Sequence, residues 1–265
     1  MSEIPVEAQV PPSKAKVDVA LNKALITAKV SASALEKILP FSTDLELRER
    51  YINFFNGLRL GKLLEDLDLI AGQVAYRHTE GWERGMTIVT AACDRIDLLG
   101  ELHSDRDLQL LASINWVGRS SIEVGVKISS KEGDSWKRVA RAYFIMVARR
   151  EGKAEPVNSL EAVSMDEQRR FRESEQRQQE RRSISQTNYL NNTPTAEESQ
   201  VLHELFLQIK KGEVAGVSME NSIRQSTLLM HPQSRNVHDN IFGGYLMREA
   251  FELAWNITYL YCRQK

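Results

Sequence analysis

The chain has 265 residues, and its 35 lysines and arginines nearly balance its 36 aspartates and glutamates, which gives a formal net charge of −1. This length is enough for one large or two modest domains, and the near-neutral balance implies no nucleic-acid or anionic-membrane partner. Two cysteines argue against a disulfide framework. No apolar run approaches the roughly 18 to 20 residues of a membrane span.

Residues 1–32 are predicted to be a disordered or targeting segment. Residues 2–13 contain three prolines and two glutamates, a composition typical of unstructured chain. Residues 14–30 carry lysines among apolar residues and could form a basic amphipathic helix. They lack arginine and contain Asp18, so they are not a clear mitochondrial presequence.

Residues 33–150 are predicted to form a first module. It opens with a strand at 33–41 and a short helix that begins after Asp44 and runs to about Phe55. The stretch 58–78 has apolar residues at three- and four-residue steps, which predicts a long amphipathic helix. Asp68 lies beside its apolar face, where a carboxylate is costly to bury unless it has partners or a function.

Strands follow this helix. Residues 86–98 are rich in β-branched side chains, residues 110–116 and 122–128 alternate apolar with polar positions, and 139–149 form a last long strand. Short turns connect the later strands, at 118–120 and 131–134. We therefore predict an antiparallel sheet with one face covered by the long helix, which is an α+β fold.

Residues 151–192 are predicted to be a linker that contains a solvated helix of alternating acids and arginines at 165–182. Residues 193–265 are predicted to begin a second module. Thr195 and Glu198 form a capping box for a helix that ends at Gly212. A strand at 222–230 and a helix at 241–261 follow. The sequence then stops, so we expect this second module to be truncated.

The two long helices align at an offset of 183 residues. Gly61 falls on Gly244, and Leu63, Ala71 and Tyr76 also have identical counterparts. Asp68 falls on Phe251 and Asn240 on Gly57, so each copy lacks what the other has. This reciprocity suggests one composite site between two similar modules.

Asn240 precedes a pair of glycines, Gly243 and Gly244, at the start of the second helix. Backbone amides at the positive end of a helix dipole can hold an anion or a developing oxyanion. A glycine turn needed only for tight packing is the alternative, and Asn240 and the reciprocal acid favour the chemical interpretation.

The segments HPQSRNVHDNIFGGYLMREAFELAW and LRLGKLLEDLDLIAGQVAYRH, with INWVGRSSIEV and FIMVARR, resemble the double-hotdog acyl-coenzyme A thioesterases of the mitochondrial type. The resemblance runs from about residue 33 to 265. It implies a hotdog fold, in which a curled sheet wraps a long helix, with two modules in tandem and the active site between them.

The resemblance implies hydrolysis of acyl-coenzyme A thioesters, with Asp68 and Asn240 as the catalytic pair and the amides of Gly243 or Gly244 as oxyanion donors. Asp68 would be either general base or nucleophile. No metal or redox cofactor is needed, because coenzyme A enters as part of the substrate. Pairing of hotdog modules into a homo-oligomer and a mitochondrial location are also implied, with a cytoplasmic location as the alternative.

Other residues carry weaker hypotheses. Arg119, in the turn at 118–121, could meet a coenzyme A phosphate, but a solvated turn residue is the favoured interpretation. Glu65 and Asp66 are expected to be solvated or capping charges. A hotdog dehydratase that acts on hydroxyacyl thioesters is the second enzyme hypothesis. That reaction usually needs a histidine beside the acid, and the first-helix region offers none at the right place. The remaining alternative is an inactive, truncated hotdog protein that binds acyl groups or a full-length partner.

Overall fold

The computed structural model describes residues 24–187, 192–213, 219–235 and 240–262. The chain divides into two compact units. The first contains residues up to 172 together with 228–252, and the second contains 173–227 together with 253–265. Most of the predicted 1–32 segment lies outside the described residues.

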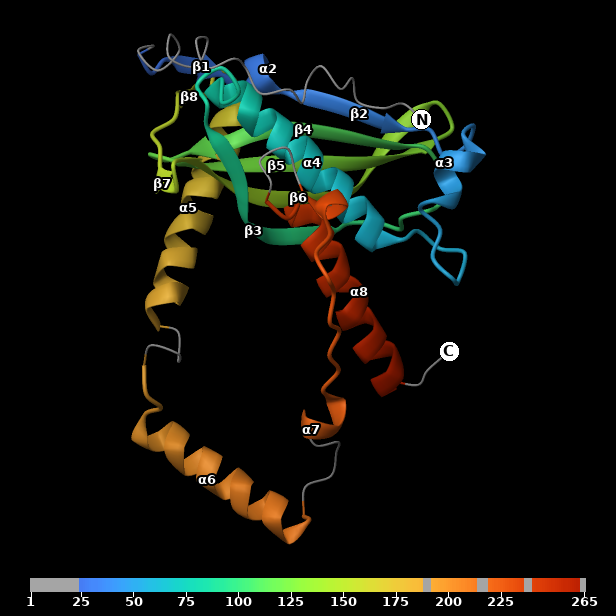
Figure 1. The fold of residues 1–265 in the computed structure, drawn as a ribbon, viewed down its shortest axis with the longest axis vertical. Helices are drawn as coiled ribbons and strands as arrows, with labels where there is room; N and C mark the ends of the chain where they lie inside the picture. The colour runs from blue at the N-terminus through green and yellow to red at the C-terminus, as the bar shows by residue number, and fades with distance from the viewer. Residues whose placement is uncertain (1–23, 188–191, 214–218, 236–239, 263–265) are drawn as a thin grey trace. The chain divides into compact units, whose positions relative to one another are not determined.

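A six-stranded antiparallel sheet forms the first unit (Figure 1). Its strands run in the order β2-β4-β5-β6-β3, and the short β7 pairs with β6. The bounds are β2 Leu35–Leu39, β3 Thr87–Leu98, β4 Leu108–Val117, β5 Ser121–Glu132, β6 Ser135–Arg150 and β7 Lys153–Ala154. The predicted strands are confirmed, with ends that move by a few residues.

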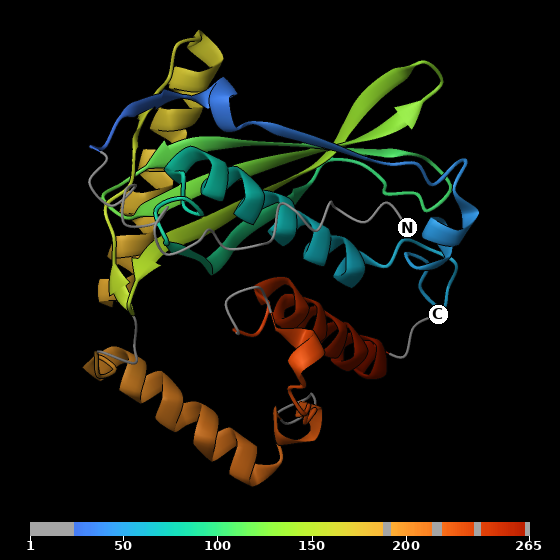
Figure 2. The same ribbon diagram turned by 45° about the horizontal axis from the view of Figure 1, so that its top comes forward.

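The long helix α4, Leu60–Thr79, lies across one face of this sheet (Figure 2). Its apolar stripe is buried against inward-facing residues of β4, β5 and β6. The helix contributes Leu63, Leu67, Ile70, Ala71 and Val74, all at most 3% exposed. One helix covered by a curled antiparallel sheet is the arrangement that the sequence predicts.

The short helix α3, Leu45–Glu49, ends earlier than predicted. The Asp44 side chain caps it by accepting a hydrogen bond from the Leu47 amide. Beyond it, Asn53 Oδ1 accepts from the amides of Phe55 and Gly57 at 2.9 and 3.0 Å. These local bonds compete with helix formation, so the chain turns instead of continuing the helix to Phe55.

Two boundaries of the first module differ from the prediction. Residues 27–33 form β1, Thr27–Lys29, and the short helix α2, Val30–Ser33. β1 pairs in parallel with β8, Ser159–Glu161, which lies in the predicted linker. Residues on both sides of the predicted boundaries therefore belong to the folded unit.

The charged helix α5, Met165–Thr187, is longer than predicted, and its first turns are not simply solvated. Arg170 donates to Ser113 Oγ at 2.8 Å, and Asp166 lies 3.9 Å from Lys127 Nζ. Ser113 alternates with the core residues of β4, so it faces away from α4. The start of α5 thus packs on the outer face of the sheet, through polar groups that a search for apolar periodicity does not detect.

In the second unit, α6 spans Ala196–Lys211 with the predicted capping box at Thr195 and a left-handed Gly212 at its end. The strand predicted at 222–230 is wrong. Residues Met219–Ser222 form α7, a one-turn 3₁₀ helix spans Pro232–Ser234, and the residues between them pair with no strand in the described part of the chain. A strand needs a neighbouring ladder to be stable.

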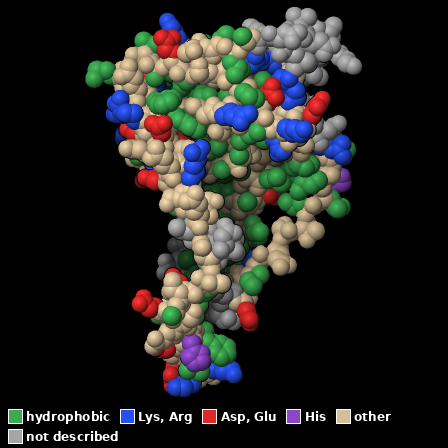
Figure 3. Space-filling view, turned by 90° about the vertical axis from the view of Figure 1, so that its left-hand side faces the viewer, with side chains coloured by type: hydrophobic (Ala, Val, Ile, Leu, Met, Phe, Trp, Pro, Cys, Tyr) green, Lys and Arg blue, Asp and Glu red, His purple; other side chains and the backbone are tan. Residues whose placement is uncertain are grey.

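The helix α8, Gly243–Cys262, matches the predicted second long helix. Among the described residues, none of the helices combines the length and hydropathy needed to cross a bilayer. The face seen in Figure 3 mixes basic, acidic and apolar side chains, as the near-zero net charge of the sequence leads one to expect.

Candidate active site

The backbone around α8 repeats that around α4 at the predicted offset. Both helices have 20 residues, and their first and last residues correspond at 183 positions apart. Before α4, Ile52 forms an isolated antiparallel bridge with Leu58. Before α8, their counterparts Arg235 and Ile241 form the same bridge. The repeat seen in the sequence is therefore a repeat of structure in these segments.

Asp68 lies where the first turn of α8 meets α4 and the sheet. It is 3% exposed, which confirms its predicted place beside the apolar face. Thr90 of β3 donates a hydrogen bond to Asp68 Oδ1 at 2.6 Å, and the backbone amide of Gly244 also donates to this carboxylate. The acid from one repeat and an amide from the other thus share one site.

The two glycines at the start of α8 permit this close approach. A Cβ on Gly243 would lie 3.1 Å from Asp68 Oδ2 and 3.3 Å from Thr90 Cβ. A Cβ on Gly244 would lie only 2.9 Å from the backbone Cα of Glu65, which cannot move without shifting α4. Glycine is required here because the helix end must touch α4 closely enough for its amide to reach Asp68.

Thr90 is a site residue that the sequence analysis missed. It pairs with Met146 of β6, and the ladder is shifted between Thr90 and Ala92. Such bulges often re-aim side chains next to active sites. The comparison of repeats found Asp68, but it covers only the helix segments and could not reach a residue on a strand.

The pKa of the Asp68 carboxyl is raised above its ordinary value, because burial disfavours the charged form. The hydrogen bonds from Thr90 and Gly244 act in the opposite direction and lower it. Burial also raises the pKa of the Cys93 thiol on β3 to about 11, and the nearby Asp68 charge contributes to that increase. A carboxyl with a raised pKa in a packed site is a candidate general base.

Asn240 lies three residues before Gly243 and is exposed. Residues 236–239, directly before it, are outside the described part of the chain. Its neighbour Ile241 is held by the bridge to Arg235. That the Asn240 carboxamide faces Asp68 stays a prediction.

Arg119 is exposed in the turn between β4 and β5, where its backbone carbonyl accepts a hydrogen bond from the Val157 amide at 3.0 Å. Contact with a coenzyme A phosphate stays a prediction for this residue.

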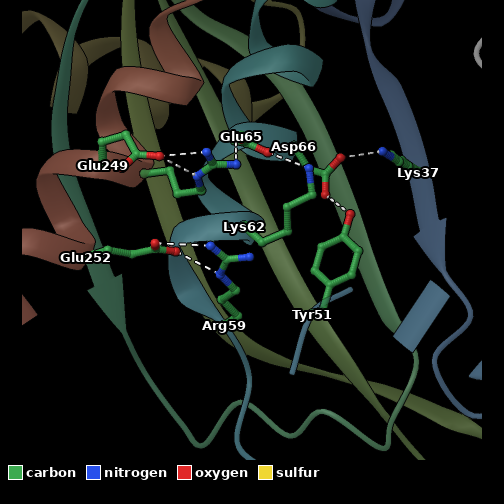
Figure 4. A network of polar contacts seen from close by, with 9 residues as sticks. Lys37, Tyr51, Arg59, Lys62, Glu65, Asp66, Glu249 and Glu252 are labelled. Carbon is green, nitrogen blue, oxygen red and sulfur yellow. Dashed lines mark hydrogen bonds and ion pairs between the residues drawn. The ribbon is translucent and has the colours of Figure 1, made fainter. Parts of the chain in front are cut away.

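Asp66 is not a solvated charge, contrary to the prediction. It is 8% exposed, it accepts from Lys37 Nζ at 2.7 Å, and it also accepts from the Tyr51 hydroxyl (Figure 4). Burial, together with the Asp66 charge, raises the pKa of Tyr51. These partners come from β2 and the turn after α3, so position within the helix could not reveal them.

Glu65 is buried as well, at 9% exposure, which corrects the second of these predictions. It forms ion pairs with Lys62 on its own helix and with Arg248 on α8, the latter at 2.7 Å. One turn further along, Arg59 donates to both carboxylate oxygens of Glu252 at 2.8 and 3.1 Å (Figure 4). Two ion pairs therefore join α8 to α4 and to the N-cap residue that precedes it.

His78, at the end of α4, has a structural role. It is 2% exposed, its Nε2 lies 3.0 Å from the Asn158 carbonyl, and Asn158 donates to the His78 carbonyl at 2.8 Å. Within the described ranges, no group of three or more His, Cys, Asp or Glu side chains is placed to hold a metal ion.

Comparison with known proteins agrees with this geometry. Residues 52–137 match the Thioesterase superfamily. The chain is 36% identical over 243 residues to human mitochondrial acyl-coenzyme A thioesterase 9, covering 86% of this chain and 55% of that protein. It is 32% identical over 121 residues to Protein VdlD of Helicobacter pylori, covering 45% of this chain and 67% of that protein. The chain belongs to the thioesterase superfamily.

Solved structures share the fold. The acyl-CoA hydrolase of Staphylococcus aureus, determined with butyryl coenzyme A and coenzyme A, superimposes with a TM-score of 0.52 at 23% identity, covering 68% of this chain and 99% of that one. A hexameric acyl-CoA thioesterase gives a TM-score of 0.51 at 24% identity, covering 61% of this chain and 98% of that one. The predicted hotdog fold is confirmed. The chain spans about half the length of the curated mitochondrial relatives that it matches.

Proposed function

We propose that this protein hydrolyses acyl-coenzyme A thioesters to a fatty acid and free coenzyme A. The observation that supports the proposal most directly is the buried Asp68, which accepts hydrogen bonds from Thr90 and from the Gly244 amide at the start of the other repeat's helix. The names of the curated relatives, acyl-coenzyme A thioesterases, support the same reaction class.

In the proposed reaction, ionised Asp68 takes a proton from a water molecule whose oxygen bonds to the thioester carbonyl carbon. The carbonyl becomes an oxyanion, the carbon–sulfur bond then breaks, and the protonated Asp68 returns its proton to the coenzyme A thiolate. General-base catalysis of this kind contributes roughly 10²–10⁴-fold. Asp68 could instead attack the carbonyl directly and form an anhydride that water hydrolyses.

The neighbouring groups have distinct proposed roles. Gly244 uses its amide to hold Asp68, so we assign the oxyanion to the amide of Gly243, the first residue of α8, which has no intrahelical acceptor. Each such donor contributes about 3–4 kcal/mol. Asn240 would orient the attacking water, and Thr90 fixes the carboxylate through its 2.6 Å bond.

We also propose that the protein acts in mitochondria, as the names of its relatives suggest, and that hotdog modules pair into a homo-oligomer. One protein with this fold is described as hexameric. Arg119 remains a proposed contact for the coenzyme A phosphates. The predicted division into a first module, a linker and the start of a second module is likewise a proposal.

The test is a continuous assay of medium-chain acyl-coenzyme A hydrolysis with a thiol reagent. We expect Asp68→Asn to lower kcat by about 10²–10⁴-fold, because the amide cannot accept the proton. Asn240→Ala should lower it as well. Asp66→Asn is the matched control, since it removes a carboxylate from the same helix that bonds to Lys37 and Tyr51 instead.

Full activity in a folded Asp68→Asn variant would refute the assignment. A wild-type protein that binds acyl-coenzyme A, releases no coenzyme A and captures a full-length relative would support the alternative of an inactive binding protein. A fatty acid without ¹⁸O after a single turnover in ¹⁸O-water would identify Asp68 as the nucleophile, because it forms only when water attacks the Asp68 carbon of the anhydride and the Asp68 oxygen leaves with the product.

A further inference from the structure

The contacts between α4 and α8 are reciprocal. A Cβ on Gly61 would meet Arg248 Cγ at 2.9 Å, and a Cβ on Gly244 would meet the Cα of Glu65 at 2.9 Å. Gly244 is the counterpart of Gly61, and Arg248 is the counterpart of Glu65. Each contact is therefore repeated with the two helices exchanged, which is the signature of a two-fold relation between similar elements.

The ion pair between Glu65 and Arg248 lies at the centre of this relation, because each residue faces its own counterpart. Its geometry is well defined, with 2.7 Å between Glu65 Oε1 and an Arg248 guanidinium nitrogen. Glu249 accepts from the same guanidinium at 2.7 Å. The partners are only 11% and 20% exposed in their side chains, so water screens their attraction poorly.

On α4, the ion pair lies one helical turn from the Asp68 carboxylate. On α8, it lies one turn from the Gly244 amide. Glu65 precedes Asp68 by three residues on α4, and Gly244 precedes Arg248 by four residues on α8. Residues at these spacings are neighbours on one helix face. Sliding α8 by one turn along α4 would separate both Glu65 from Arg248 and the Gly244 amide from Asp68.

Building on the proposed function, we propose that Glu65 and Arg248 are positioning residues, whose ion pair sets the register of α8 on α4 and thereby holds the Gly244 amide on Asp68. The pair between Arg59 and Glu252 supports the same register one turn away. Its side chains are 38% and 35% exposed, so we expect it to contribute less.

The test follows the protonation of Asp68 directly, by ¹³C NMR of carboxyl-labelled protein, with Asp68→Asn used to assign the signal. The groups that face Asp68 are Thr90 and Cys93 from β3 and the Gly244 amide from α8. None of them is changed by Glu65→Gln or Arg248→Met. We expect both variants to move the Asp68 titration to higher pH, because the hydrogen bond from Gly244 that lowers its pKa is weakened.

Glu65→Gln makes this result specific. Removing a nearby negative charge would by itself lower the Asp68 pKa, so a shift to higher pH can only come from lost positioning. We expect kcat for acyl-coenzyme A to fall about 10-fold to 100-fold with little change in KM, as for other small misplacements of a reactive group. The double variant should be no worse than Arg248→Met, and Arg248→Lys should retain part of the effect.

Arg106→Met is the matched control, since it removes an arginine from an exposed ion pair with Glu132 and should leave the titration and kcat unchanged. An unshifted or lowered Asp68 titration in folded Glu65→Gln would overturn the inference. If the wild type hydrolyses no thioester, the proposed function fails, but the titration still decides whether the ion pair positions Asp68. If Arg248→Met does not fold, Glu65→Gln and Arg248→Lys provide the same test.

Discussion

The two helical repeats have nearly the same backbone but different surroundings. In both, the amide that precedes the helix bonds back to a carbonyl eight residues earlier, from Arg59 to Tyr51 at 2.7 Å and from Phe242 to Ser234 at 3.0 Å. In the first repeat the sheet covers the helix, and Leu63 is 3% exposed. In the second, the counterpart Leu246 is 46% exposed. The repeat therefore fixes local backbone geometry, while burial depends on which strands are present.

The repeats also contribute different groups to the candidate site. The first supplies the carboxylate at Asp68, and the second has Phe251 in its place. The second supplies the amides at the start of its helix. In the first repeat, the corresponding helix start packs closely against Arg248 and Glu252 through Gly61. Under the proposed function, the two copies together supply one set of reactive groups.

The largest effect that can sharpen this comparison comes from truncating the paired leucines. Leu63→Ala should lower the free energy of unfolding by about 2–5 kcal/mol, because it leaves a cavity under the sheet. Leu246→Ala should cost about 0.5 kcal/mol, as at other exposed positions. Urea denaturation of both variants measures the difference. Equal losses would show that a surface in solution covers α8 as the sheet covers α4.

The paired glycines give the next effect. Gly244→Ala should destabilise the protein by about 1–3 kcal/mol and lower activity, because its methyl group meets the backbone of Glu65. Gly61→Ala should cost less, since its methyl group meets the side chains of Glu252 and Arg248, which can adjust. Thermal unfolding and the thiol assay report both. A larger effect at Gly61 would contradict the assignment of the closer backbone contact to Gly244.

The smallest effect concerns the cost of burying the acid. The pKa of Asp68 is higher in the folded than in the unfolded chain, so its contribution to stability is present at low pH and is lost as pH rises through the folded value. Asp68→Asn removes this loss. Its Tm relative to wild type should therefore be higher at neutral pH than in acid, and a pH-independent difference would argue against a raised pKa.

Much of the fold was accessible from the sequence because it depends on local patterns. Apolar periodicity located α4 and α8, and alternation located the strands that follow α4. The strand expected at 222–230 was wrong because a strand depends on partners elsewhere. Its composition alone could not show that no described strand lies beside it.

The site was only partly accessible for the same reason. Asp68 and Gly244 were found by comparing the repeats, and Gly243 by its place at the start of a helix. Glu65 and Asp66 were misjudged because their partners, among them Arg248 and Lys37, are far away in the chain. Thr90 was missed because its role depends on how β3 meets α4, which strand composition does not encode.

The pairing of Glu65 with its own counterpart has a consequence for how such a protein can vary. In an assembly of identical subunits, a residue on the symmetry axis meets another copy of itself, so an acid there would face an acid and every substitution would occur twice. Joining the two halves in one polypeptide removes this constraint. Unlike charges can then occupy the axis, and either half can change without altering the other.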